Sequence, residues 1–246
     1  LPAPAAGKTT AQDVQAQVSW QPCFTAPGSA AEAVRIISEY FSRNPAATSY
    51  SLGINDTNRY CTCPACEATD GGRLNSIGVH DVSASYYAWC NAIAAGLKTQ
   101  YPDRWLGLLA YNGAYSPPVG QRLDDRLVPF ITYDRMKWAD PELERLGHEH
   151  TERWAGAAGV LGWYDYIYGG QFYLMPRVYM HHMAGYLRYG HAHGVRHYYA
   201  EAYPSGDWHE GPKLYVALRL LWNPDQDVDA LLQDWVDRVA APVAAQ

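Results

Sequence analysis

Short apolar runs alternate with helix-like stretches along most of this chain, and this alternation restricts its fold more than any other feature. The runs from Trp105 to Tyr111 and from Leu127 to Tyr133 are apolar at nearly every position. Such runs are typical of strands that are buried on both faces of a parallel sheet. Strands that alternate with helices and are joined by right-handed crossovers predict an α/β fold with a parallel sheet.

Six strands are predicted, and they lie near residues 15, 49, 105, 127, 160 and 195. A closed (β/α)8 barrel has eight strands in about 250 residues. We therefore expect residues 15–246 to form a TIM-barrel type of fold that is incomplete, with its N-terminal strands missing. A smaller open α/β sheet is the alternative. Pro129 argues against a central position for its strand, because proline has no backbone N–H to donate.

Two further local predictions concern the N-terminal part of the chain. Residues 1–14 are rich in alanine, proline and threonine and have no hydrophobic period, so a tail or linker is expected there. A helix is expected to begin at Ser29, with Ser29 and Glu32 as a capping box. Its predicted buried stripe consists of Ala33, Ile36, Ile37 and Tyr40.

Charge and aromatic content narrow the classes of function. The net charge is −6 and the 19 lysines and arginines are scattered, so no nucleic acid partner is expected. The 20 tyrosines and 9 tryptophans, against 4 phenylalanines, suit wet grooves and the faces of sugar rings. No apolar run is long enough to cross a bilayer. The glycine-rich nucleotide loops and the serine-hydrolase motif are missing, so no cofactor is expected.

Four carboxylates directly follow apolar strand cores: Asp56, Asp134, Asp165 and Glu201. In a barrel they would share the end of the sheet at which active sites lie. Glycoside hydrolysis requires one carboxyl group that protonates the leaving oxygen and a second that activates water, attacks, or steadies an attacking group. We predict Asp56 and Glu201 as the catalytic pair. The substrate-binding residues expected around them are Asn55, Tyr111, Asp134, Trp163, Asp165, Tyr166, Tyr203 and Trp208.

Each of these carboxylates also has a purely structural interpretation, since Asp and Glu after strands often cap helices or form turns. That interpretation applies more to Asp134 and Asp165 than to the predicted catalytic pair.

Three cysteines, Cys61, Cys63 and Cys66, form a tight cluster five residues after Asp56. Cys-x-x-Cys is half of a structural zinc site, and the second half is not evident from spacing. His80 or Cys23 could supply a further ligand. A zinc site, a disulfide and plain loop packing remain open for this cluster, and no metal is assigned.

Several segments together resemble the domain-of-unknown-function 4838 group, whose members are classed as glycoside hydrolase family 163 and are distantly similar to family 67 α-glucuronidases. The resemblance rests on QPCFTAP, SLGINDTNRYCTCPAC, LLAY, GWYDYIYG, YYAEAYPSGDW and LYVALRLLWNPDQDVDALLQDW. It covers roughly residues 15–240.

The resemblance implies a barrel with a sugar cleft in a longer protein that is secreted or periplasmic. It implies an endo-β-N-acetylglucosaminidase activity on N-glycans, with Asp56 and Glu201 at active-site strand ends. The chain begins at Leu1 without an initiator methionine, so processing or truncation and further domains of a parent chain are expected. Alternative functions are an α-glucuronidase-like hydrolase, a non-catalytic carbohydrate-binding or degenerate barrel, and a metal-dependent hydrolase that uses the cysteine loop.

Overall fold

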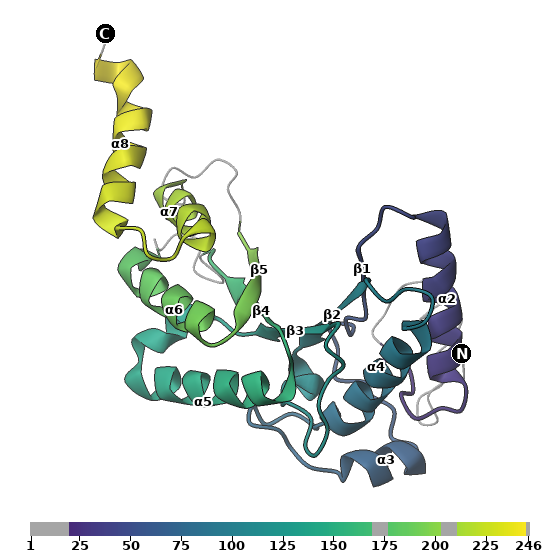
Figure 1. The fold of residues 1–246 in the computed structure, drawn as a ribbon. Helices are drawn as coiled ribbons and strands as arrows, with labels where there is room; N and C mark the ends of the chain where they lie inside the picture. The colour runs from purple at the N-terminus through teal and green to yellow at the C-terminus, as the bar shows by residue number, and fades with distance from the viewer. Residues whose placement is uncertain (1–19, 169–176, 203–210, 245–246) are drawn as a thin grey trace. The chain divides into compact units, whose positions relative to one another are not determined.

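The computed structural model describes residues 20–168, 177–202 and 211–244. It contains an α/β arrangement in which α-helices separate successive strands, except between β2 and β3 (Figure 1). The strands are β1 Ser49–Ser51, β2 Trp105–Ala110, β3 Leu127–Thr132, β4 Leu161–Tyr166 and β5 Val195–Glu201. The helices are α2 Ser29–Arg43, α3 Pro64–Asp70, α4 Ser83–Leu97, α5 Pro141–Ala157, α6 Met180–Ala192, α7 Gly211–Trp222 and α8 Val228–Ala244. Two 3-10 helices are η1 Asn112–Ala114 and η2 Arg135–Ala139.

The order of strands in the sheet, β1-β2-β3-β4-β5, follows the order of the chain. Five of the six predicted strands are therefore present. The strand predicted near residue 15 falls mostly outside the described residues, and residues 20–23 are irregular. None of the helices in the described part of the chain is long and apolar enough to cross a membrane.

The chain divides into two compact units. Unit 1 is Leu1–Thr132 with Arg153–Leu161, and unit 2 is Tyr133–Glu152 with Gly162–Gln246.

In unit 1, β1 pairs in parallel with β2, and β2 pairs in parallel with β3. Helices α2 and α4 lie side by side, and Gly96 permits their approach because a Cβ there would lie 2.7 Å from Val34 (Figure 1). Fully or almost fully buried apolar side chains fill this unit: Ile37, Phe41, Tyr86, Tyr87, Ile93, Leu97, Leu106, Leu108 and Trp154. The ring of Trp154 meets that of Tyr87 edge to face at 5.3 Å.

Helix α2 begins at Ser29, as predicted, but the predicted cap at this end is wrong. Gly28, in a left-handed conformation with φ 79°, is the N-cap, and Ser29 is already inside the helix. No side chain caps this end, so the predicted capping box does not form. The buried face is also rotated from the predicted stripe: Ile37 and Phe41 are buried, whereas Ile36 and Tyr40 are 42% and 37% exposed.

Pro129 lies inside β3 and is paired with Leu108 of β2. Alternate residues of a strand direct their backbone groups to opposite sides. The N–H of Leu106 in β2 donates to the C=O of Arg126, which directly precedes β3. The backbone groups of the even-numbered residues of β3 therefore point toward β2, and those of Pro129 point away from β2. The missing N–H therefore removes no hydrogen bond from the β2–β3 pairing. The prediction that this strand is not central is nevertheless wrong, because β3 is the middle strand in the order of the sheet.

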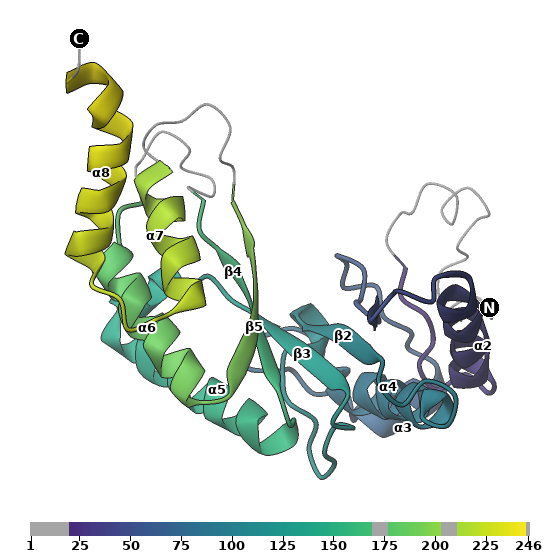
Figure 2. The ribbon, with the colours of Figure 1, turned by 45° about the horizontal axis from the view of Figure 1, so that its top comes forward.

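In unit 2, β4 and β5 are neighbours in the sheet, and α6 packs on β4 (Figure 2). The N–H of Tyr133 donates to the C=O of Tyr164, and the N–H of Ile167 donates to the C=O of Glu201. Trp163 of β4 is fully buried, and its ring lies 5.6 Å from that of Trp138. These rings form much of the core of this unit.

The contact between α6 and β4 can be tested at Gly190. A Cβ at this position would lie 2.5 Å from Cη2 of the buried Trp163 ring. We expect Gly190→Ala to lower the free energy of unfolding by about 1–3 kcal/mol through overpacking. Gly185→Ala on the same helix is the control, because no heavy atom lies within 4 Å of that Cβ and alanine favours helix by about 1 kcal/mol. Urea denaturation curves that show equal stability for the two variants would contradict this packing.

Candidate functional site

Asp56 lies in unit 1, in the loop that follows β1, and its side chain is exposed to solvent. The hydroxyl of Tyr111 donates to Oδ1 of Asp56 at 2.9 Å. Tyr111 comes directly after β2, the strand that neighbours β1. Two of the predicted site residues are thus brought together, although Asp56 lies five residues beyond the end of β1 rather than directly after the strand. The tyrosine hydroxyl holds the carboxylate in one orientation while solvent still reaches it.

The backbone beside Asp56 is fixed by a residue from far upstream. Gln21 is fully buried, and its amide Nε2 donates to the C=O of Asn55 at 2.7 Å. The N–H of Asn55 donates to Oε1 of Gln21 at 3.1 Å. The Asn55 side chain donates to the C=O of Trp20 at 2.6 Å, so in this structure Asn55 supports the loop. Its predicted contact with substrate stays a prediction.

Asn112 and Gly113, which follow β2, pack against the loop that carries Asp56. Asn112 is left-handed, with φ 53°. A Cβ on Gly113 would lie 2.6 Å from the Tyr60 ring and 2.8 Å from the C=O of His80, so only glycine fits. The Gly113 N–H donates to the hydroxyl of Tyr60 at 3.2 Å, and burial raises the pKa of Tyr60 to about 12. Tyr60 therefore stays neutral and packs the loop against η1.

The cysteine cluster lies next in the chain after this loop. The Sγ atoms of Cys23, Cys61, Cys63 and Cys66 all lie within 4.8 Å of one another. Cys23 thus joins the three predicted cysteines, whereas His80 is not part of the group. All four are free thiols here, and Cys61 and Cys66 are buried.

The protonation of these thiols differs with their surroundings. The backbone N–H of Cys66 lowers the pKa of the Cys63 thiol to about 6. Burial raises the pKa of Cys61, and it raises that of Cys66 to about 12. Four sulfur ligands converging on one point can hold a thiophilic metal ion.

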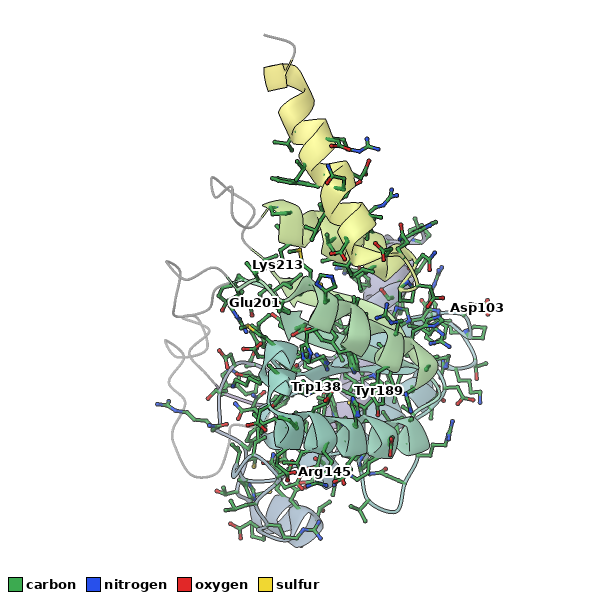
Figure 3. The ribbon with its side chains drawn as sticks, turned by 90° about the vertical axis from the view of Figure 1, so that its left-hand side faces the viewer. Asp103, Trp138, Arg145, Tyr189, Glu201 and Lys213 are labelled. Atoms are coloured by element: carbon green, nitrogen blue, oxygen red, sulfur yellow. The ribbon has the colours of Figure 1, made fainter. Side chains whose placement is uncertain are left out.

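Glu201 lies in unit 2, at the last position of β5, and is half-buried. The hydroxyl of Tyr164 on the neighbouring strand β4 donates to Oε1 of Glu201 at 2.9 Å. Burial and this hydrogen bond both raise the pKa of Tyr164, so the hydroxyl remains a donor. Figure 3 shows Glu201 of β5 and Lys213 of α7 near the same end of this unit.

A row of tyrosine rings runs beside Glu201, and we call it the tyrosine row. Tyr164 and Tyr199 have their ring centroids 4.8 Å apart, Tyr164 and Tyr166 5.7 Å, and Tyr166 and Tyr168 6.2 Å. Tyr199 is 56% exposed. Sequence reasoning overlooked Tyr199, although it precedes Glu201 by two residues and so must share its face of the strand. Aromatic rings beside a carboxylate provide a surface on which a sugar ring can stack.

Asp165 points to the opposite side of β4 and is only 1% exposed. Its carboxylate accepts hydrogen bonds from the N–H of Arg135 at 3.0 Å, the N–H of Tyr166 at 2.8 Å and the hydroxyl of Tyr198 at 2.8 Å. The guanidinium of Arg135, also 1% exposed, lies 3.9 Å from Oδ2. This geometry is that of a buried structural ion pair.

Asp134 is half-buried at the start of η2, and both of its carboxylate oxygens accept from Nη2 of Arg177, at 2.8 and 3.0 Å. Arg177 also donates to the C=O of Tyr168 at 2.7 Å. Asp134 therefore orients Arg177 and, through it, the end of the tyrosine row.

Trp163 is fully buried, and the Arg135 guanidinium lies 4.0 Å from the centre of its ring. A sugar cannot reach this ring without a rearrangement of the core, so Trp163 packs the interior in this structure. The two remaining predicted contacts, Tyr203 and Trp208, lie outside the described residues.

Parallel strands with helices between most of them, and with polar and aromatic groups near the strand ends, define an α/β protein with a candidate functional site. The chain matches the family described as Domain of unknown function (DUF4838) over residues 7–246, and it belongs to this family. No curated protein matches the chain.

Proposed function

We propose that this protein is a glycoside hydrolase that acts on a complex glycan, of the endo-β-N-acetylglucosaminidase kind, built on an incomplete (β/α)8 barrel. The observation that carries the proposal is the Glu201 carboxylate, which accepts the Tyr164 hydroxyl at 2.9 Å beside the tyrosine row. An accessible carboxylate next to stacked aromatic rings suits the cleavage of a bond between sugars.

Asp56 is the second carboxylate of the proposal. Asp56 lies in the loop after β1, and like Glu201 it accepts a tyrosine hydroxyl, here that of Tyr111. In a retaining mechanism, one carboxyl group gives a proton to the leaving oxygen while the other attacks or orients the group that attacks. Asp56 is exposed and Glu201 half-buried, whereas the Asp165 carboxylate is enclosed by its partners. The accessibility of their carboxylates therefore favours Asp56 and Glu201 over Asp165 as catalytic residues.

The direct test is mass-spectrometric product analysis after incubation of the protein with N-glycans and, separately, with glucuronoxylan oligosaccharides. We expect N-glycans to be cut within the chitobiose core, which leaves one N-acetylglucosamine on the reducing side. Release of glucuronic acid from the xylan oligosaccharides would instead support an α-glucuronidase-like enzyme. Binding of glycans by the folded protein without any product would refute the hydrolase proposal in favour of a binding protein.

A further inference from the structure

We propose that Cys23, Cys61, Cys63 and Cys66 bind one zinc ion as a structural site. The four sulfurs come from two stretches of chain that are far apart in the sequence. Cys23 precedes α2, Cys61 lies in the loop after Asp56, and Cys63 and Cys66 begin α3. The sequence gives three of these four ligands by their spacing and leaves Cys23 and His80 as candidates for the fourth.

The distances between the sulfurs suit a single tetrahedral ion. Zinc binds thiolate sulfur at about 2.3 Å, so the corners of a regular ZnS₄ tetrahedron are about 3.8 Å apart. The Sγ atom of Cys23 lies 3.9 Å from that of Cys63 and 3.7 Å from that of Cys66. With all four sulfurs within 4.8 Å of one another, the ligands are nearly in place before an ion enters.

The same distances argue against other uses of four cysteines. In an iron–sulfur cluster the four cysteines are divided among two or more irons, so their sulfurs cannot all lie as close together as around one ion. A disulfide brings two sulfurs to about 2.05 Å and sorts the cysteines into pairs. Here the sulfur of Cys23 lies at nearly equal distances from the sulfurs of Cys63 and Cys66. The sulfurs therefore form one group of four and not two disulfide-like pairs.

Donor groups surround the sulfurs as expected for metal-bound thiolates, which accept hydrogen bonds. The Thr25 Oγ1 atom lies 3.1 Å from Sγ of Cys66 and 3.8 Å from that of Cys63. The backbone of Cys66 also makes a hydrogen bond to the sulfur of Cys63, and the backbone of Cys63 makes a hydrogen bond to the sulfur of Cys61. Such outer contacts orient the ligands and offset their negative charge.

Bound zinc would join the segment before α2 to the loop that carries Asp56. Cys23 is two residues after Gln21, which bonds to the backbone of Asn55. Cys61 is five residues after Asp56. The ion would therefore hold the Asp56 loop on the C-terminal side of Asp56, while Gln21 holds it on the N-terminal side. This structural role does not depend on the proposed glycoside hydrolase activity.

The first experiment measures metal content. The 246-residue protein is prepared in reducing buffer with added zinc, dialysed against metal-free buffer, and examined by inductively coupled plasma mass spectrometry. We expect about one zinc per chain and far less iron. One iron per chain, or no retained zinc in a protein that is folded by circular dichroism, would overturn the proposal.

The second experiment locates the ion by the rate of cysteine alkylation, read by peptide mass spectrometry with and without a strong chelator. We expect Cys23, Cys61, Cys63 and Cys66 to react at least tenfold faster after chelation. Cys90, fully buried in α4, is the internal reference and should stay protected. Equal rates with and without chelator, or cysteines that react only after reduction of a disulfide, would overturn the proposal.

A matched pair of variants completes the test. Cys66→Ala should lose at least nine tenths of the zinc, and Cys90→Ala should keep it, although both replace a buried cysteine. Loss of zinc from both variants alike would overturn the assignment. The alkylation measurement on the unaltered protein decides the matter even if Cys66→Ala does not fold.

Discussion

Glu201→Gln is expected to reduce glycan cleavage by about 10³-fold while the fold is kept, because the amide can neither donate the proton nor carry the negative charge that hydrolysis requires. The amide still accepts from the Tyr164 hydroxyl, so the packing around it is preserved. Tyr164→Phe, which removes the orienting hydroxyl and leaves the carboxyl group, should have a smaller effect of about tenfold. The measurement is the initial rate of product formation from N-glycans.

Two single variants, Glu152→Gln and Tyr189→Phe, are the matched controls. Glu152 of α5 also accepts a tyrosine hydroxyl, that of Tyr189 at 3.3 Å, but it lies on a helix rather than at a strand end. We expect these variants to keep the rate of the unaltered protein. If Glu201→Gln cleaves glycans as fast as the Glu152→Gln control, then Glu201 is not a catalytic residue.

Asp165→Ala should destabilise the protein by about 3–5 kcal/mol, because it leaves the buried Arg135 guanidinium without its carboxylate. Both side chains of this pair are only 1% exposed, so solvent does not replace the lost partner. The change also removes the acceptor of the Tyr198 hydroxyl and of two backbone N–H groups. The free energy of unfolding from urea denaturation is the quantity to compare.

Asp229→Ala is the control for this stability prediction. Asp229 also pairs with a basic side chain, His181 at 3.0 Å, but its side chain is 78% exposed. Exposed pairs contribute between about 0 and 1 kcal/mol, so little change is expected. A loss of less than about 1 kcal/mol for Asp165→Ala would show that the buried pair does not stabilise this unit.

Strands β2, β3 and β4 were predictable because each is a short, mainly apolar run bounded by turn residues. Tyr111 directly follows β2 and Asp56 lies in the loop after β1, so both could be expected at one edge of the sheet, because β1 and β2 are parallel neighbours. Helix α3 could not be predicted in this way, since seven residues are too few to show a helical period.

Side-chain contacts between distant segments were much harder to predict. Nothing in the spacing shows that Gln21 contacts Asn55, because this contact depends on the tertiary fold. For the same reason the sequence left both Cys23 and His80 as candidates for the fourth member of the cysteine cluster, and the fold brings in Cys23. The different roles of neighbouring residues on β4 were open to prediction, because side chains alternate between the faces of a strand. Tyr164 and Asp165 therefore point to opposite sides, one toward Glu201 and the other toward Arg135.

The buried amide of Gln21 also bears on how this protein can be shortened for laboratory work. The amide makes the two backbone hydrogen bonds to Asn55 that a neighbouring strand would otherwise make. A fragment that started at α2 would lack this residue and would leave the backbone beside Asp56 unsupported. Any trimmed version intended to preserve that loop should therefore keep the residues from Trp20 onward.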